Sequence, residues 1–181
     1  MDILIRSFIT PLGELLLGSY HGALCLCDWK ERRSRDAVDR RLQRGIGVRY
    51  KAGTSPVIEQ AMDQLSAYFA GGHRPLDVPL HMVGTEFQRR VWEALRGIPY
   101  GATVSYAELS DQVADRTAIR AVAAANGANA LSIFIPCHRV LGSDGDLVGY
   151  AGGVKAKRFL LELEGALMRS APGLFDGPGP M

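Results

Sequence analysis

The chain has 181 residues, of which 47% are hydrophobic and 22% charged, and its formal net charge is +2. This composition is that of an ordinary globular protein, the charge does not by itself indicate nucleic-acid binding, and no apolar run approaches the roughly 20 residues that span a bilayer. An odd number of cysteines, three, and the lack of a hydrophobic signal region predict a reducing, cytoplasmic setting without a disulfide framework.

Three apolar segments at the N-terminus, residues 3–9, 12–20 and 23–29, are separated by turns that contain glycine. This pattern predicts a small antiparallel sheet. Cys25 and Cys27 lie two apart in the last segment, but the C-x-C spacing is unusual for zinc and no second ligand pair follows. We therefore expect no metal site.

Residues 30–51 carry nine Lys and Arg against three Asp and Glu, a local charge of +6. A solvated linker or helix face is the favoured interpretation, with a DNA-binding surface as the alternative. Ser55-Pro56 then predicts the start of a core-facing helix that ends at Gly71-Gly72. We place a domain boundary near residues 72–82.

Two capping boxes, Thr85 to Gln88 and Ser105 to Glu108, predict the starts of two further helices. Thr117 is expected to cap a third helix over residues 118–126, which is rich in alanine. The last two helices would form a helix-turn-helix, a weak indication of DNA binding on its own. The smooth third helix could pack inside a core or enter a narrow groove.

Residues 131–135 are branched or aromatic and predict a buried strand that ends at Pro136. Cys137, His138 and Arg139 follow. A cysteine at its ordinary pKa is only roughly 3% thiolate at pH 7, so a nucleophilic role needs a base or cation beside it, for which His138 and Arg139 are candidates. From these residues alone, a buried structural thiol is an equal alternative.

A glycine-rich loop over residues 149–153 precedes a last helix, expected over residues 154–167. Its apolar side would hold Phe159, Leu160, Leu163 and Leu167. Glu164 falls at the border of that side, and a partly buried carboxylate needs a partner. Residues 169–181 are rich in glycine and proline and predict a disordered tail.

Residues 85–165 resemble the O6-alkylguanine-DNA alkyltransferase family, which moves an alkyl group from guanine onto a cysteine. The matching positions occur in the family's order: Phe87-Gln88, Val91-Trp92, Ile98 to Gly101, Val104 to Tyr106, Arg120 to Val122, Asn129, Ile135 to Val140, Gly149-Tyr150, Gly152-Gly153, Lys157, Leu160-Leu161 and Glu164. The first 80 residues match only in general pattern.

The resemblance implies an α/β N-terminal domain over residues 1–80, with a small antiparallel sheet plus helix of ribonuclease-H-like type. A mostly α, winged helix-turn-helix domain over residues 81–168 would follow. The catalytic residues implied are Cys137 as nucleophile, His138 as a base acting through a water, Glu164 as the carboxylate orienting it, and Tyr106. Tyr106 would help to turn the phosphate and would bond guanine N3.

For DNA binding and base flipping the resemblance implies Arg120, which fills the stack when the target nucleotide leaves it. The other residues implied in this role are Tyr106, Ala121, Asn129 and Ser105. The substrate pocket would use Val140, Tyr150, Ala151 and Asn129, in part through backbone groups. Three departures from the family's usual residues are Ala123, Ala130 and Ala151, and none removes a reactive group.

The activity implied is irreversible, single-turnover transfer from O6-alkylguanine, and O4-alkylthymine, in double-stranded DNA to Cys137, by a monomer without cofactor or metal. A cysteine hydrolase is a rival, because Cys137, His138 and Glu164 could also serve acyl transfer. A second rival is a non-catalytic reader of alkylated DNA, but such readers lack the nucleophilic cysteine.

Overall fold

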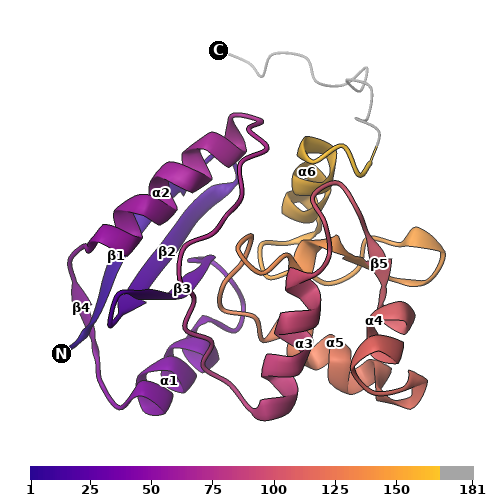
Figure 1. The fold of residues 1–181 in the computed structure, drawn as a ribbon, viewed down its shortest axis with the longest axis horizontal. Helices are drawn as coiled ribbons and strands as arrows, with labels where there is room; N and C mark the ends of the chain where they lie inside the picture. The colour runs from indigo at the N-terminus through magenta and orange to yellow at the C-terminus, as the bar shows by residue number, and fades with distance from the viewer. Residues whose placement is uncertain (168–181) are drawn as a thin grey trace.

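The computed structural model describes residues 1–167, and its N-terminal half is built on a four-stranded sheet (Figure 1). The strands are β1 (Ile3–Thr10), β2 (Gly13–Tyr20), β3 (Ala23–Trp29) and β4 (Tyr50–Ala52), in the order β3-β2-β1-β4. The antiparallel pairing predicted for the first three is confirmed. The prediction of a purely antiparallel sheet is wrong, because β4 pairs parallel with β1. Three residues are too few to show the alternation that identifies a strand.

The basic stretch, residues 30–51, contains a helix, α1 (Arg35–Ile46). Of the linker and the helix expected for this stretch, the helix is therefore the one that forms. Val38 and Leu42 on this helix are buried and pack with Leu26 of β3. Gly47 ends the helix in the left-handed conformation, with φ of 83°. One side of α1 therefore belongs to the core and only the other faces solvent.

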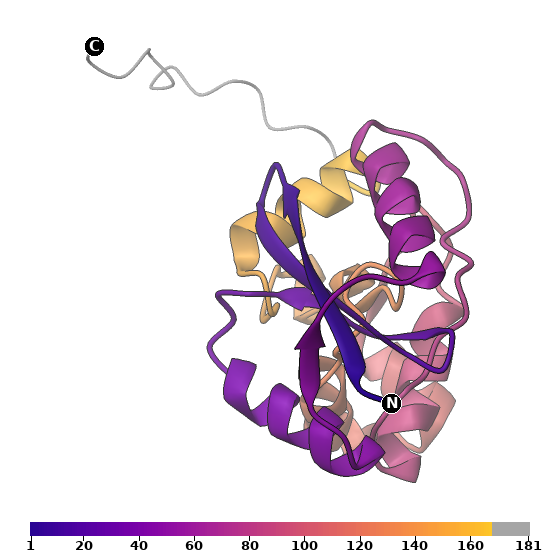
Figure 2. The ribbon, with the colours of Figure 1, turned by 90° about the vertical axis from the view of Figure 1, so that its left-hand side faces the viewer.

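The helix α2 (Pro56–Phe69) begins where the sequence predicts. Ser55 Oγ accepts from Ile58 N at 3.4 Å, and Pro56 occupies the first turn. The buried side of α2 packs with β2 and β3, whereas α1 lies on the other side of the strands (Figure 2). The sheet is thus covered on both faces.

Both capping boxes in the C-terminal half are confirmed. Thr85 and Gln88 exchange side-chain and backbone hydrogen bonds at the start of α3 (Glu86–Arg96), and Ser105 and Glu108 do so at α4 (Tyr106–Val113). A two-residue strand, β5 (Val104–Ser105), immediately precedes α4.

The third predicted helix is present as α5 (Ile119–Gly127), but Thr117 does not cap it. Asp115 Oδ1 instead accepts from Thr117 N at 2.7 Å, and a 3-10 turn, Arg116–Ala118, leads into α5. The aspartate takes the capping role two residues earlier because its carboxylate accepts the first free N–H of the turn.

The predicted strand over residues 131–135 is wrong. The segment is buried as expected, but it turns back on itself, with Ile133 at φ of 74° and a bridge between Ser132 and Ile135. Asn129 fixes this turn, since its Oδ1 accepts from Leu131 N and its Nδ2 donates to Ile135 O, both at 2.9 Å. A short apolar run indicates burial, and burial alone does not require an extended strand.

The last helix, α6 (Val154–Leu163), is shorter than predicted, because Gly165 reverses the chain with φ of 74°. Phe159 was expected on the buried side but is 36% exposed, whereas Leu160 and Leu161 are fully buried. Glu164 sits at the C-cap and is buried. The predicted tail, residues 169–181, lies outside the described residues.

A continuous apolar core joins the two halves of the described chain. It contains Leu17 of β2, Tyr68 of α2, Trp92 of α3, Leu160 of α6 and the cysteine Cys137. The thiol therefore lies where the N-terminal sheet and helix meet the C-terminal helices.

Within residues 1–167, no helix has the length and apolar character needed to cross a membrane.

Candidate active site

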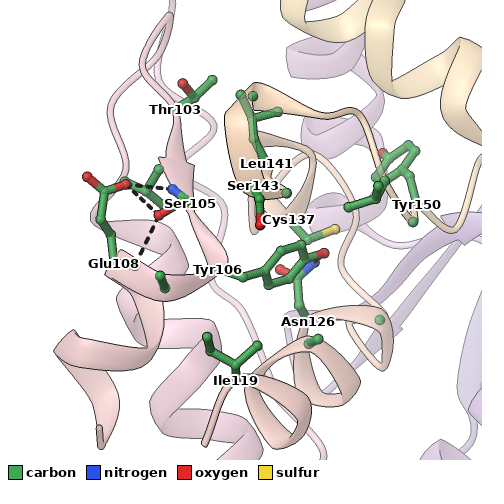
Figure 3. Close-up of a pocket in the computed structure, with 18 of the residues that line it drawn as sticks. Thr103, Ser105, Tyr106, Glu108, Ile119, Asn126, Cys137, Leu141, Ser143 and Tyr150 are labelled. Atoms are coloured by element: carbon green, nitrogen blue, oxygen red, sulfur yellow. Dashed lines mark hydrogen bonds between the residues drawn. The ribbon is translucent and has the colours of Figure 1, made fainter. Parts of the chain in front are cut away.

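Cys137 lies at the bottom of a cavity of about 950 Å³ (Figure 3). Cys137 is the first residue of a 3-10 turn, Cys137–Arg139, which follows Pro136. This turn leads into β6 (Val140–Leu141), which pairs with β5. The residue is only 3% exposed, but it lines the cavity. The cavity wall is contributed by residues 32–34, 103–108, 141–145 and 148–151, and by four residues of α5. The thiol is thus reachable only by a group that enters the cavity.

His138, which follows Cys137 in the chain, forms a buried pair with Glu164. His138 Nε2 lies 2.7 Å from Glu164 Oε1, and both side chains are fully buried. Burial lowers the pKa of His138, although Glu164 opposes that change. Burial alone would raise the pKa of Glu164, but hydrogen bonds from His138, Arg139 and Tyr68 lower it to about 2. A neutral imidazole oriented by an ionised carboxylate is the arrangement of a general base.

Arg139, a candidate for the cation beside the thiol, is bound by Glu164 and by the Ile98 carbonyl. Its Nε donates to Glu164 Oε2 at 2.7 Å, its Nη2 to Glu164 Oε1 at 3.0 Å, and its Nη1 to Ile98 O at 2.6 Å. The Arg139 guanidinium contacts the Glu164 carboxylate because a buried positive charge needs a counter-charge.

Burial favours the protonated form of the Cys137 thiol. Burial raises its pKa above the ordinary value, and a hydrogen bond from Asn129 and the charge of Lys157 only oppose that rise. Neighbouring groups therefore do not offset the effect of burial on the pKa of this thiol. His138 Nδ1 is buried and has no hydrogen-bond partner among the described residues, so it can accept a proton. Ionisation belongs to the reaction step itself.

Tyr106 and Ser105 lie together at the start of α4, on the cavity wall. Tyr106 Oη accepts a hydrogen bond from Asn126 Nδ2 at 3.2 Å, and burial raises the pKa of Tyr106. Ser105 Oγ accepts from Glu108 N at 3.1 Å, so this hydroxyl is engaged in capping. Tyr106 is thus a neutral phenol in the same cavity as Cys137.

Arg120 and Ala121 lie outside the cavity, in the first turns of α5. Both are exposed, whereas Ala123 on the same helix is half-buried and lines the cavity. The short side chains of Ala121, Ala123 and Ala124 leave a smooth surface beside the long cationic side chain of Arg120, as the sequence predicts.

The predicted pocket residues Tyr150 and Ala151 line the cavity, and Tyr150 Oη accepts from Trp29 Nε1 at 3.1 Å. Val140 is fully buried behind the wall, and its carbonyl already accepts from Lys157 Nζ at 2.5 Å. Asn129 stands outside the cavity and acts on the loop before Pro136. The structure therefore brings two of the four predicted pocket residues, Tyr150 and Ala151, to the cavity itself.

Comparison with known proteins agrees with this geometry. A family model described as "6-O-methylguanine DNA methyltransferase, DNA binding domain" matches residues 86–166. A Mycobacterium leprae protein named "Methylated-DNA--protein-cysteine methyltransferase" is 41% identical over 172 residues, which cover 94% of this chain and 98% of that protein. The chain belongs to the 6-O-methylguanine DNA methyltransferase family.

Two more similarities extend this result. A Mycobacterium tuberculosis (strain H37Rv) protein with the same name is 53% identical over 116 residues, 64% of this chain and 70% of that protein. The crystal structure of Mycobacterium tuberculosis OGT in complex with DNA has a TM-score of 0.76 and 42% identity, covering 90% of this chain and 93% of that one. Because the match covers 90% of this chain, the likeness to Mycobacterium tuberculosis OGT includes the N-terminal sheet.

In this member of the family, the sequence gives no sign of a role for Tyr68, and it places Lys157 in the family pattern without a role. Tyr68 of α2 donates its hydroxyl to Glu164 Oε1 at 2.6 Å, and Lys157 Nζ donates to Val140 O and, at 2.8 Å, to Val148 O. Burial lowers the pKa of Lys157 to about 8. The only available signal was that a tyrosine or lysine on the buried side of a helix needs a polar partner.

Arginines of the basic stretch hold the end of α5 instead of facing solvent. Arg32 Nη2 donates to Gly127 O at 2.6 Å and Nη1 to Asn129 O at 3.0 Å, and Arg41 Nη2 donates to Ala128 O at 2.5 Å. The buried Asp28 pairs with Arg32 at 2.8 Å. Cationic groups at a helix C-terminus satisfy its free carbonyls, so the N-terminal half supports the helix that lines the cavity.

The other two cysteines, Cys25 and Cys27, are buried in β3, and burial raises the pKa of Cys25 to about 12. In the described part of the chain, no three His, Cys, Asp or Glu side chains are grouped so that they could hold a metal ion.

Proposed function

We propose that this chain repairs O6-alkylguanine in double-stranded DNA by moving the alkyl group irreversibly onto Cys137. The observation that carries this proposal is the Cys137 thiol at the bottom of a cavity, backed by neutral His138 and ionised Glu164. Family membership supplies the substrate class, since its relatives are methylated-DNA--protein-cysteine methyltransferases.

The reaction is a displacement at the alkyl carbon. His138 takes the proton of Cys137, directly or through a water, while the sulfur forms a bond to the carbon and the bond from that carbon to guanine O6 breaks. Guanine departs with the electron pair, and the Tyr106 hydroxyl and the backbone N–H of Ala151 stabilise the charge that develops on it. A thioether is not hydrolysed, so each molecule reacts once.

The alkylated nucleotide must leave the double helix to reach Cys137, at a cost of a few kcal/mol. Arg120 occupies the gap, and the small side chain of Ala121 lets α5 approach the groove. Tyr106, Ser105 and Asn129 position the DNA and the loop. We assign α4 and α5 to a winged helix-turn-helix domain over residues 81–168, which follows a ribonuclease-H-like domain over residues 1–80.

The substrate pocket is lined by Tyr150 and Ala151, with Val140 and Asn129 supporting it from behind its wall. It accepts O4-alkylthymine as well as O6-alkylguanine. The protein acts as a monomer and needs no cofactor or metal. Binding to DNA depends mainly on phosphate contacts, so it weakens as salt rises and shows little sequence preference.

Stoichiometry tests this function. A limiting amount of protein is incubated with excess duplex DNA that contains O6-methylguanine, and demethylated product is followed with time. We expect a plateau at one methyl group per protein molecule and no product with Cys137→Ser. Continued turnover would contradict the proposal, and turnover of a simple ester would favour the cysteine hydrolase.

A further inference from the structure

Asn126 combines two features that the helix around it does not require. It lies on α5 in the cavity wall next to Tyr106, and it is only 4% exposed (Figure 3). Its Nδ2 donates to Tyr106 Oη at 3.2 Å, and its Oδ1 is buried without a hydrogen-bond partner among the described residues. An unpaired buried carbonyl is unfavourable, so an apolar side chain would stabilise this position better.

The end of α5 does not explain this amide. The backbone N–H of Ala128 bonds to the carbonyls of Ala124 and Ala125, and Arg32 and Arg41 bind the later carbonyls. The Asn126 side chain therefore takes no part in the capping of the helix. Its one hydrogen bond within the described chain is directed at Tyr106.

That bond determines the direction of the Tyr106 hydroxyl. A phenol has one O–H donor and oxygen lone pairs that accept. The Asn126 amide N–H donates to the Tyr106 oxygen, so the hydrogen of the Tyr106 hydroxyl takes no part in this hydrogen bond. Among the described residues the Tyr106 hydroxyl makes no other hydrogen bond, so the O–H is free to donate to a group in the cavity.

We infer that Asn126 is a positioning residue that fixes the Tyr106 hydroxyl as a hydrogen-bond donor to the departing purine base. This inference rests on the proposed function. When the sulfur of Cys137 bonds to the alkyl carbon and the carbon–O6 bond breaks, the electron pair passes into the base. Tyr106 donates its hydrogen to that charge, and Asn126 N–H stabilises the phenol oxygen. The thiol proton goes to His138.

Exchange of the amide for a carboxylate tests the inference. In Asn126→Asp the ionised side chain can only accept, so the Tyr106 hydroxyl turns towards it and the base loses its donor. We expect the single-turnover rate on saturating duplex DNA with O6-methylguanine to fall about 100-fold, the lower end of the loss seen when one oxyanion-hole donor is removed. The rate should recover at lower pH, where the carboxyl is protonated and donates again, a recovery that the parent chain lacks.

Three comparisons separate this role from a structural one. Gln60→Glu adds the same charge on the exposed side of α2 and should leave the rate unchanged. Alkylation of Cys137 by iodoacetamide should be the same in Asn126→Asp as in the parent chain. In a Tyr106→Phe background, the aspartate should cause no further loss, because the two residues act through one hydroxyl.

Failure of the proposed function and failure of the inference about Asn126 give different results. If the parent chain transfers no methyl group, the proposed function fails whatever the variants do. If the parent chain is active and Asn126→Asp matches it at every pH, or slows Tyr106→Phe as much as it slows the parent, the inference about Asn126 is overturned. If the aspartate variant does not fold, Asn126→Leu is compared in the same two backgrounds, and equal losses there overturn the inference.

Discussion

Replacing Glu164 with glutamine is expected to lower the free energy of unfolding by roughly 3–5 kcal/mol, because it leaves buried Arg139 without a counter-charge. The pKa of Glu164 supports this magnitude. A folded value of about 2 against an ordinary 4.5 corresponds to about 3 kcal/mol at neutral pH. The side chain is fully buried, so solvent does not screen this contribution.

The sign of the pH dependence follows from the same shift. Because the pKa of Glu164 is lower in the folded protein, its contribution is present above about pH 4.5 and is lost as the pH falls towards 2. Urea unfolding of the parent chain and Glu164→Gln should therefore differ most at pH 7 and converge in acid. Glu93→Gln breaks an exposed pair with Arg96 and should cost less than about 1 kcal/mol.

Two results would refute this reasoning. One is a Glu164→Gln variant no less stable than Glu93→Gln. The other is a difference between Glu164→Gln and the parent chain that stays constant from pH 7 to the acid limit. Arg139→Met in the Glu164→Gln background should restore part of the lost stability, because no unpaired buried charge remains.

Three further predictions concern the site. Tyr68→Phe removes a hydrogen bond of 2.6 Å to the Glu164 carboxylate and should cost about 1.5–3 kcal/mol in urea unfolding; no loss would show that the bond does not contribute. Arg120→Ala should slow repair of duplex DNA while sparing transfer from free O6-alkylguanine, and equal losses in the two assays would contradict its role in the stack. Because burial raises the pKa of Cys137, its alkylation by iodoacetamide should still accelerate above pH 9, and a plateau below pH 8 would rule out a protonated resting thiol.

Local signals in the sequence predicted local structure well. The boxes at Thr85 and Ser105 are recognisable because the two partners in each lie three residues apart, and both helices begin where they indicate. The run 131–135 was predicted to be a strand and is a turn, because the hydrogen bonds of Asn129 replace those of a sheet. Hydrophobicity alone does not show where backbone hydrogen bonds go.

The distant partners of the site could not be predicted in the same way. Tyr68 reaches Glu164 across 96 residues, and Arg32 reaches Asn129 across 97. Such contacts depend on how the N-terminal sheet and helices pack against the C-terminal half, and neither spacing nor periodicity carries that information. The resemblance predicted Cys137, His138 and Glu164 as site residues because their positions lie within a recognisable family pattern.

Mass spectrometry of the protein after incubation with duplex DNA containing O6-methylguanine is the most direct test of the central claim. We expect one added methyl group, on the peptide that contains Cys137, and none on the peptide that contains Cys25 and Cys27. An unmodified protein after the DNA has been repaired, or a methyl group on any other residue, would contradict it.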